Sequence, residues 1–159
     1  MNAPSRSRAR AAARLAAVQA LYQQEMERTP LPRLLDEFHR HRLGAEVDES
    51  DGVRLADAEV EFFDDIVRGV TARRDEIDAL IETKLAKGWN LARLDRPLRQ
   101  ILRAGTYEML ARIDVPAASV ITEYVSVADA FYDRRETGFV NGLLDALAKA
   151  IRGQAIAND

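Results

Sequence analysis

Four arginines near the amino terminus are the side chains with the clearest chemistry in this chain. The charged residues that precede Glu25 are all arginines: Arg6, Arg8, Arg10 and Arg14. Residues 1–24 therefore carry +4, and because the whole chain has a formal net charge of -3, the remainder carries -7. A guanidinium group is always charged and holds phosphate oxygens with a planar fork of N–H donors. The distribution predicts a localised contact with phosphates or with an acidic partner.

Two other interpretations of this basic segment stay open on pattern alone. One is a solvated basic helix face. The other is a mitochondrial targeting peptide, which is also rich in Arg, contains Ser and lacks acids. The regular spacing of apolar residues through Met26 argues against targeting, because it is typical of a helix that packs in a fold.

Aromatic side chains would add base recognition, because unstacked RNA bases stack on exposed rings. Tyr22 and Phe139 are the candidates. For both, packing in the core is the competing interpretation and the one that aromatic burial statistics favour. Trp89 is assigned to the core.

Groups that serve catalysis are scarce. The chain has no cysteine, which excludes disulfides and thiolate chemistry and fits a reducing compartment such as the cytoplasm. Phosphate-binding glycine loops, nucleophile elbows and His-Glu-x-x-His are absent from the sequence. His39 and His41 lie two residues apart, so on a helix they point to different sides, and we expect solvated surface groups. We predict no enzyme activity, no cofactor and no metal.

A run of acids around Asp64 could imitate a carboxylate metal site. Helical di-metal sites pair a Glu with a His three residues further on, and no such pair exists here. We therefore assign Glu61, Asp64 and Asp65 to a solvated helix face.

Helical periodicity predicts the elements that carry these groups. Residues 5–27 form a first helix, whose expected buried positions are Leu15, Val18, Tyr22 and Met26. Arg6, Arg10 and Arg14 are spaced by four and form a neighbouring ridge. Pro30 and Pro32 end this helix, and a second one, marked by Leu34, Leu35 and Phe38, runs to about Leu43. The acidic stretch 44–54 is expected to be an exposed loop.

Three further helical patterns follow. Apolar residues at helical spacing from Phe63 to Leu85 predict a long helix with a break between Thr71 and Asp75. Asp95 is an expected N-cap ahead of Pro97. The next helix should bury Leu98, Ile101, Leu102, Gly105, Met109 and Ile113, with Gly105 permitting a close approach by a neighbouring helix.

Pro116 opens the next helix, and Thr137 is the expected cap of the last one. Expected buried positions of the former are Val120, Ile121, Tyr124, Val125, Ala128 and Phe131, and of the latter Val140, Leu143, Leu144, Leu147 and Ile151.

The pattern as a whole predicts an all-α protein, because no segment alternates with a period of two. About seven helices form two packed helical-bundle subdomains, 1–74 and 75–159, of a single domain 1–159. No stretch has the roughly 18 uninterrupted apolar residues that a membrane span needs, so no membrane contact is expected.

Several strings, in order along nearly the whole chain, resemble the NusB family of bacterial transcription antitermination factors. They are Ser-Arg-Ala-Arg followed by Ala-Val-Gln-Ala-Leu-Tyr (17–22), Ile-Leu-Arg-Ala-Gly-Thr-Tyr-Glu-Met (101–109), Asp-Val-Pro (114–116) and Phe-Val-Asn-Gly-Leu-Leu-Asp (139–145). The resemblance implies an all-helical fold of two subdomains. It also implies binding of boxA RNA of ribosomal operons together with a small-subunit ribosomal protein, NusE. The pair joins RNA polymerase with other Nus factors and suppresses premature termination. Members differ in self-association, so a homodimer is among the implied assemblies.

The resemblance also assigns roles to individual residues. Arg6, Arg8 and Arg10, with Arg14 one turn further, correspond to the phosphate-binding motif, and Tyr22 to the family tyrosine of the first helix. Phe139 and Asn141 become candidates for base stacking and base-edge hydrogen bonds. Arg135 departs from the family pattern and would add positive charge to the RNA surface. The NusE contact is expected on the helix that carries Arg99, Arg103 and Glu108. A helical protein-interaction module without RNA binding remains the alternative function.

Overall fold

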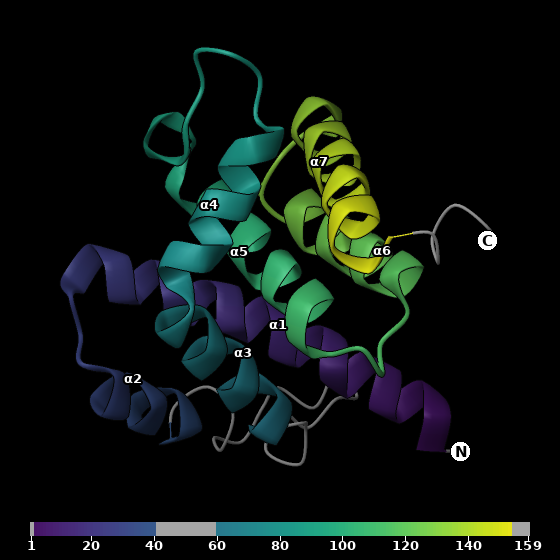
Figure 1. The fold of residues 1–159 in the computed structure, drawn as a ribbon. Helices are drawn as coiled ribbons and strands as arrows, with labels where there is room; N and C mark the ends of the chain where they lie inside the picture. Colours follow the sequence, from purple (N-terminus) through teal and green to yellow (C-terminus); the bar gives the residue numbers. More distant parts are fainter. Residues whose placement is uncertain (1, 41–59, 154–159) are drawn as a thin grey trace. The chain divides into compact units, whose positions relative to one another are not determined.

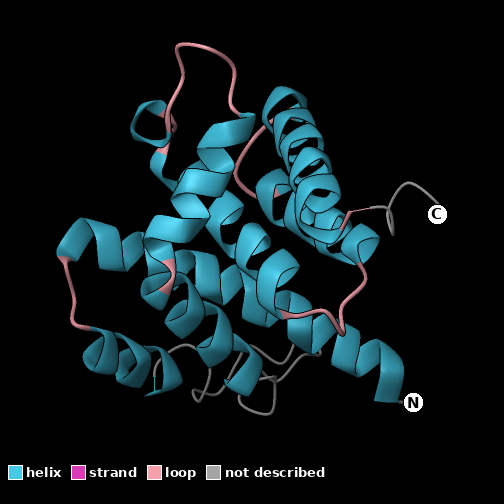
Figure 2. Cartoon of the chain, in the orientation of Figure 1, coloured by secondary structure: helices cyan, strands magenta, loops and turns pink. Residues whose placement is uncertain are grey.

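The computed structural model describes residues 2–40 and 60–153, with side chains from residue 7 onward. Within these ranges every regular element is helical, which confirms the all-α class (Figures 1 and 2). The elements are α1 (Asn2–Glu27), α2 (Leu31–Phe38), α3 (Val60–Ala72), α4 (Arg74–Lys84), the 3₁₀ turn η4 (Leu91–Arg93), α5 (Arg96–Ala111), α6 (Ala117–Asp129) and α7 (Arg134–Arg152).

Residue contacts divide the chain into two compact units, unit 1 (Met1–Arg68) and unit 2 (Gly69–Asp159). The division falls inside α3, whereas the sequence analysis placed it between residues 74 and 75. Unit 1 thus holds α1, α2 and the first part of α3. Unit 2 holds the rest of α3 and the helices from α4 onward.

Helix α1 ends at Glu27 as predicted, begins at Asn2 where residue 5 was expected, and buries a different face. Val18 is buried as expected, and Leu15 is half-buried. Tyr22 and Met26 are exposed, so their prediction as core residues was wrong. The other apolar residues that α1 buries are Ala13, Ala16, Ala17, Ala20 and Leu21. Small side chains let neighbouring atoms approach the helix backbone closely, and the alanine-rich side therefore faces inward.

Helices α2 and α3 are joined in unit 1 by aromatic packing. Leu34, Leu35 and Phe38 are buried. The rings of Phe38 and Phe63 stack with centroids 5.6 Å apart. The predicted end of the second helix near Leu43 and the acidic loop 44–54 lie outside the described residues.

The predicted break in the long apolar segment is confirmed. Helix α3 ends at Ala72 and α4 starts at Arg74, with Arg73 off helical geometry at φ -113° and ψ 24°. Near this break, in unit 2, the ring of Tyr107 lies against Gly69. A Cβ atom on Gly69 would come within 2.1 Å of the Tyr107 Cζ atom. Only glycine therefore fits this position without a shift of the ring.

Unit 2 is built around α5, which packs against α4, α6 and α7, while α4 and α6 also pack against α7 (Figure 1). Residues 100–109 of α5 are all buried. A Cβ on Gly105 would lie 3.1 Å from the Leu144 Cδ2 atom of α7, which confirms the predicted close helix approach.

Some predicted helix-end details were wrong, because the helices stop earlier or start elsewhere. Ile113 is 83% exposed and Phe131 is exposed, since α5 ends at Ala111 and α6 at Asp129. Helix α7 starts after Asp133, so Thr137 lies in its first turn and donates a hydrogen bond to the carbonyl of Arg134 instead of capping the helix. Asp95 does occupy the N-cap position of α5, but its carboxylate accepts a hydrogen bond from the Tyr132 hydroxyl and makes no cap.

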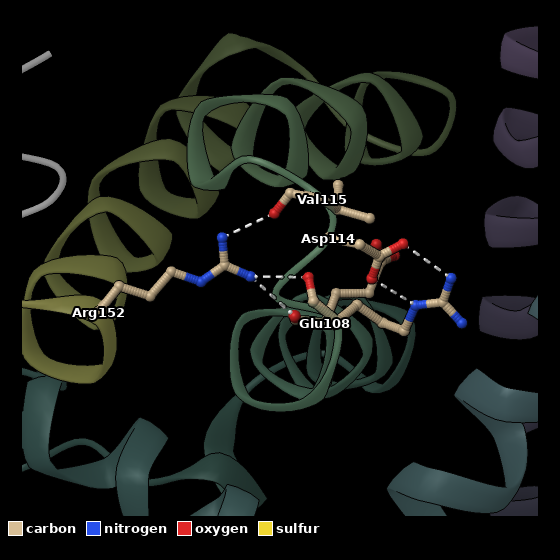
Figure 3. Close-up of polar contacts among 5 residues, drawn as sticks. Glu108, Asp114, Val115 and Arg152 are labelled. Atoms are coloured by element: carbon tan, nitrogen blue, oxygen red, sulfur yellow. Dashed lines mark hydrogen bonds and ion pairs between the residues drawn. The ribbon is translucent and has the colours of Figure 1, made fainter.

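The last residue of α7 ties together the connection between α5 and α6. Arg152 donates from Nη1 to the Val115 carbonyl (2.7 Å) and from Nη2 to the Glu108 carbonyl (3.1 Å), as Figure 3 shows. Its Nε donates to Met109 O (3.1 Å), and Nη2 also donates to Arg112 O (3.0 Å). The carbonyls of Met109 and Val115 gain a donor in this way. Those of Glu108 and Arg112 already accept the backbone N–H groups of Arg112 and Val115, each at 3.0 Å, and gain a second donor.

Candidate nucleic-acid interface

The arginines of α1 do not form one exposed ridge. Arg6 lies in α1, but its side chain is outside the described part of the structure. Arg8 is exposed and Arg10 half-buried. The guanidinium carbons of Arg10 and Arg14 lie 4.5 and 4.9 Å from the centroid of the Phe62 ring. Arg14 is only 4% exposed.

Arg14 therefore contributes to the packing of unit 1, where its guanidinium lies on the Phe62 ring. A cation over an aromatic ring gains on the order of 0.5–2 kcal/mol, more when water is excluded. The expectation that Arg14 offers its charge to phosphate needs correction, because its head group is buried on Phe62. Within the described part of α1, Arg8 is the most exposed of the arginines, and Arg10, two residues further on, projects to another side of the helix.

The second group of predicted residues lies on α7 in unit 2. The Arg135 side chain is 93% exposed, with its Nε 3.9 Å from the Glu136 carboxylate. Phe139 is 37% exposed. Residues four apart share a helix face, and Arg135 and Phe139 indeed line the same cavity. Asn141 is exposed but is two residues from Phe139, so it projects to another side of α7.

The aromatic residues that were expected to pack in the core are more exposed than that interpretation predicts. Tyr22 and Phe139 are both partly exposed. Trp89, assigned to the core, is 51% exposed, so that prediction was wrong. The signal that was missed is local: Gly88 and Asn90 flank Trp89, and both residue types are typical of turns.

Two of the three residues predicted for the protein partner lie in the interior. Glu108 is fully buried and accepts a hydrogen bond from the Tyr124 hydroxyl at 2.5 Å. Arg103 is buried and forms a two-pronged ion pair with Asp78, at 2.8 and 3.0 Å. These groups hold unit 2 together and do not present a surface for direct contact, so their assignment is corrected. Arg99 is half-buried.

His39 differs from the predicted solvated group. It is half-buried, and its Nε2 lies 2.6 Å from the Asp64 carboxylate, joining the end of α2 to α3. Asp64 is thus part of a pair and is not a purely solvated acid, while His41 lies outside the described residues. In residues 2–40 and 60–153, no three His, Cys, Asp or Glu side chains gather as a metal site would require. No helix in the described ranges is both long and apolar enough to cross a membrane.

These features define an all-helical protein with an arginine-bearing first helix in one unit and an aromatic cavity in the other. Comparison with protein families adds the identification. The model of the NusB family matches residues 11–149, and the chain belongs to this family.

Relatives and solved structures agree with this placement. The chain is 66% identical over 145 residues to the transcription antitermination protein NusB of Novosphingobium aromaticivorans, covering 91% of this chain and 96% of the relative. A structure of T. maritima NusB is 33% identical, with a TM-score of 0.71 over 88% of this chain and 90% of that one. A crystal structure of antitermination factors NusB and NusE in complex with dsRNA is 25% identical, with a TM-score of 0.71 over 90% and 98% of the two chains.

Proposed function

We propose that this chain is a cytoplasmic transcription antitermination factor that binds single-stranded boxA-like RNA of ribosomal operons together with the ribosomal protein NusE. The observation that carries the proposal is the basic first helix. Arg8 is exposed on it, no acid precedes Glu25, and the rest of the chain is acidic. The solved complex of a related NusB with NusE and RNA supports both partners.

The mechanism follows from the chemistry of the two units. Phosphate contacts by arginines give affinity without sequence preference, and exposed rings such as Phe139 add contacts to unpaired bases. NusE raises affinity when it brings its own RNA surface, because the second contact is then effectively intramolecular. The complex joins RNA polymerase with other Nus factors and suppresses premature termination.

The salt dependence of RNA binding tests the basic helix. Single-strand binding loses affinity with salt at a slope of about -0.7 per neutralised phosphate in a log–log plot. With Arg14 buried, Arg6, Arg8 and Arg10 bound the contribution of the α1 arginines to this slope at about -2. Arg8→Ala should flatten the slope by about 0.7, and the triple Ala variant should remove about two units.

A matched control is available on α2. Arg33 is a well-exposed arginine of unit 1 that pairs with Glu37 at 3.2 Å. Arg33→Ala should leave the slope unchanged. An unchanged slope in the triple variant would refute the basic helix as the RNA site. A gel-shift experiment separates the alternative function. If the protein binds NusE but does not shift RNA, whether NusE is present or absent, the result would support the protein-interaction module instead.

A further inference from the structure

Unit 2 contains an open cavity that the sequence did not indicate. Its volume is about 550 Å³, within the usual range of small-ligand sites. Aliphatic side chains and two aromatic rings line it, together with the charged residues Arg135 and Glu136. The residues that matter for its chemistry are Leu85, Leu94, Leu98, Trp89, Phe139 and Arg135.

Trp89 is held at this cavity by its own loop. Gly88 has φ +90°, a backbone conformation suited to glycine, and its carbonyl accepts a hydrogen bond from Arg93 Nη1 at 2.7 Å. The Arg93 guanidinium carbon lies 5.0 Å from the indole centroid. Asn90 Oδ1 accepts from the Arg93 backbone N–H at 3.1 Å and caps the η4 turn. These contacts order the loop in advance, so a ligand would not have to order it.

Charged side chains of both signs lie at the border of the cavity. Lys84 and Lys87 flank the lining residues of the α4–η4 connection, Arg134 precedes Arg135, and all four side chains are exposed. Acids lie in the same segments: Glu136 lines the cavity with its carboxylate 3.9 Å from Arg135 Nε, and Asp133 is exposed. Glu82 accepts from the Leu91 backbone N–H at 3.1 Å, and Asp95 accepts from the Tyr132 hydroxyl. The Arg135 side chain is 93% exposed in spite of its pair with Glu136, so its guanidinium still presents N–H donors to a phosphate.

We propose that this cavity is a nucleobase pocket, in which an unpaired RNA base stacks on Trp89 beside Phe139 while Arg135 contacts the adjoining phosphate. The proposal rests on the proposed RNA-binding function and adds a residue, Trp89, that lies far along the chain from the basic helix. Aromatic and aliphatic lining residues next to an exposed arginine match a base attached to a phosphodiester chain. An apolar protein side chain would use the walls but not the charge.

Trp89 is the only tryptophan in the chain, so its fluorescence reports on this cavity alone. The probe is a mixed-sequence single-stranded RNA of about twelve nucleotides, within the usual site size of single-strand binders. Saturating RNA should quench the Trp89 emission. A strand of the same length with abasic ribose phosphates should bind the basic helix without this quenching.

Labelled RNA and fluorescence anisotropy give the affinities of the variants. Stacking of one base is worth enough that Trp89→Leu should weaken binding by about fivefold or more, while Trp89→Phe should stay within about threefold of the parent. Ile113→Ala is the matched control, an exposed apolar residue at the other end of α5. It should bind RNA as the parent does.

The outcomes separate this proposal from the proposed function. Trp89→Leu should keep the parental salt slope, since it removes no phosphate contact. RNA binding with the expected slope but no change in Trp89 emission, or with full affinity in Trp89→Leu, would overturn the pocket and leave the RNA-binding function standing. Emission that responds to purified NusE and not to RNA would overturn it too, assigning the cavity to an apolar protein side chain.

Discussion

Replacing Arg152 by Met tests how much the tie between α5, α6 and α7 contributes to stability. Methionine keeps the approximate length of the side chain and removes all five N–H donors. Four hydrogen bonds to the carbonyls of Met109, Val115, Glu108 and Arg112 would be lost. The positive charge near the carboxyl end of α5 would be lost as well.

The magnitude follows from these contacts. Each hydrogen bond has a net value of roughly 0.5–1.5 kcal/mol, so four would amount to about 2–6 kcal/mol. Arg152 is only partly buried, and the freed carbonyls can regain water, which places the expected loss at about 2–4 kcal/mol. For a chain of this size the thermal midpoint should fall by on the order of 5–15 °C.

Thermal unfolding followed by circular dichroism measures this effect, with two comparison variants. Arg152→Lys keeps the charge but offers one compact ammonium in place of the fork, so its loss should be intermediate. Lys149→Ala breaks an exposed ion pair with Asp145 (3.1 Å) on the same helix and should cost less than about 1 kcal/mol. Equal midpoints for Arg152→Met and Lys149→Ala would refute the view that these four bonds stabilise unit 2.

Two further stability predictions concern unit 2. Gly69→Ala should destabilise the protein by about 1–3 kcal/mol, because the new Cβ would fall 2.1 Å from Tyr107 Cζ. Gly142→Ala, whose new Cβ would meet no heavy atom within 4 Å, should be neutral or stabilising by up to about 1 kcal/mol. Urea titration measures both variants, and equal shifts of their unfolding midpoints would contradict the packing argument. Burial, together with the hydrogen bond to Asp95, raises the pKa of the Tyr132 hydroxyl above its ordinary value of 10.0. Above that pH the hydroxyl loses its proton in the unfolded chain but keeps it in the folded one, so the free energy of unfolding should fall as pH rises past 10. This fall should be smaller in Tyr132→Phe. If the thermal midpoints of the two proteins depend on pH identically between pH 9 and 11, the result would count against the pKa shift.

Local signals in the sequence predicted the helices well. Prolines act through the backbone of their own neighbourhood, and the starts of α5 at Arg96, next to Pro97, and of α6 at Ala117, next to Pro116, follow from such local rules. The break at Arg73 was expected because an unbroken helix from Phe63 to Leu85 would be unusually long. The exact start of α7 was not predicted. Asp133 occupies the N-cap position, and Thr137, the expected cap, lies inside the helix.

The candidate site was less predictable, because a helical pattern fixes the angles between side chains but not which side is covered. The ring of Phe62 covers the guanidinium of Arg14, whereas Arg8 on the same helix is exposed. Asp78 and Tyr124 likewise draw Arg103 and Glu108 inward, so two residues that looked like a partner surface serve the core.

By itself the sequence determined the all-helical class, the order of the helices, the lopsided charge and the family. All of these follow from residue types and short spacings that act along the chain. Tertiary structure decided which arginine is exposed, that Trp89 borders a cavity, and that Arg135 and Phe139 share it. Burial and exposure depend on segments far apart in the chain that meet only after folding, and no local pattern contains that information.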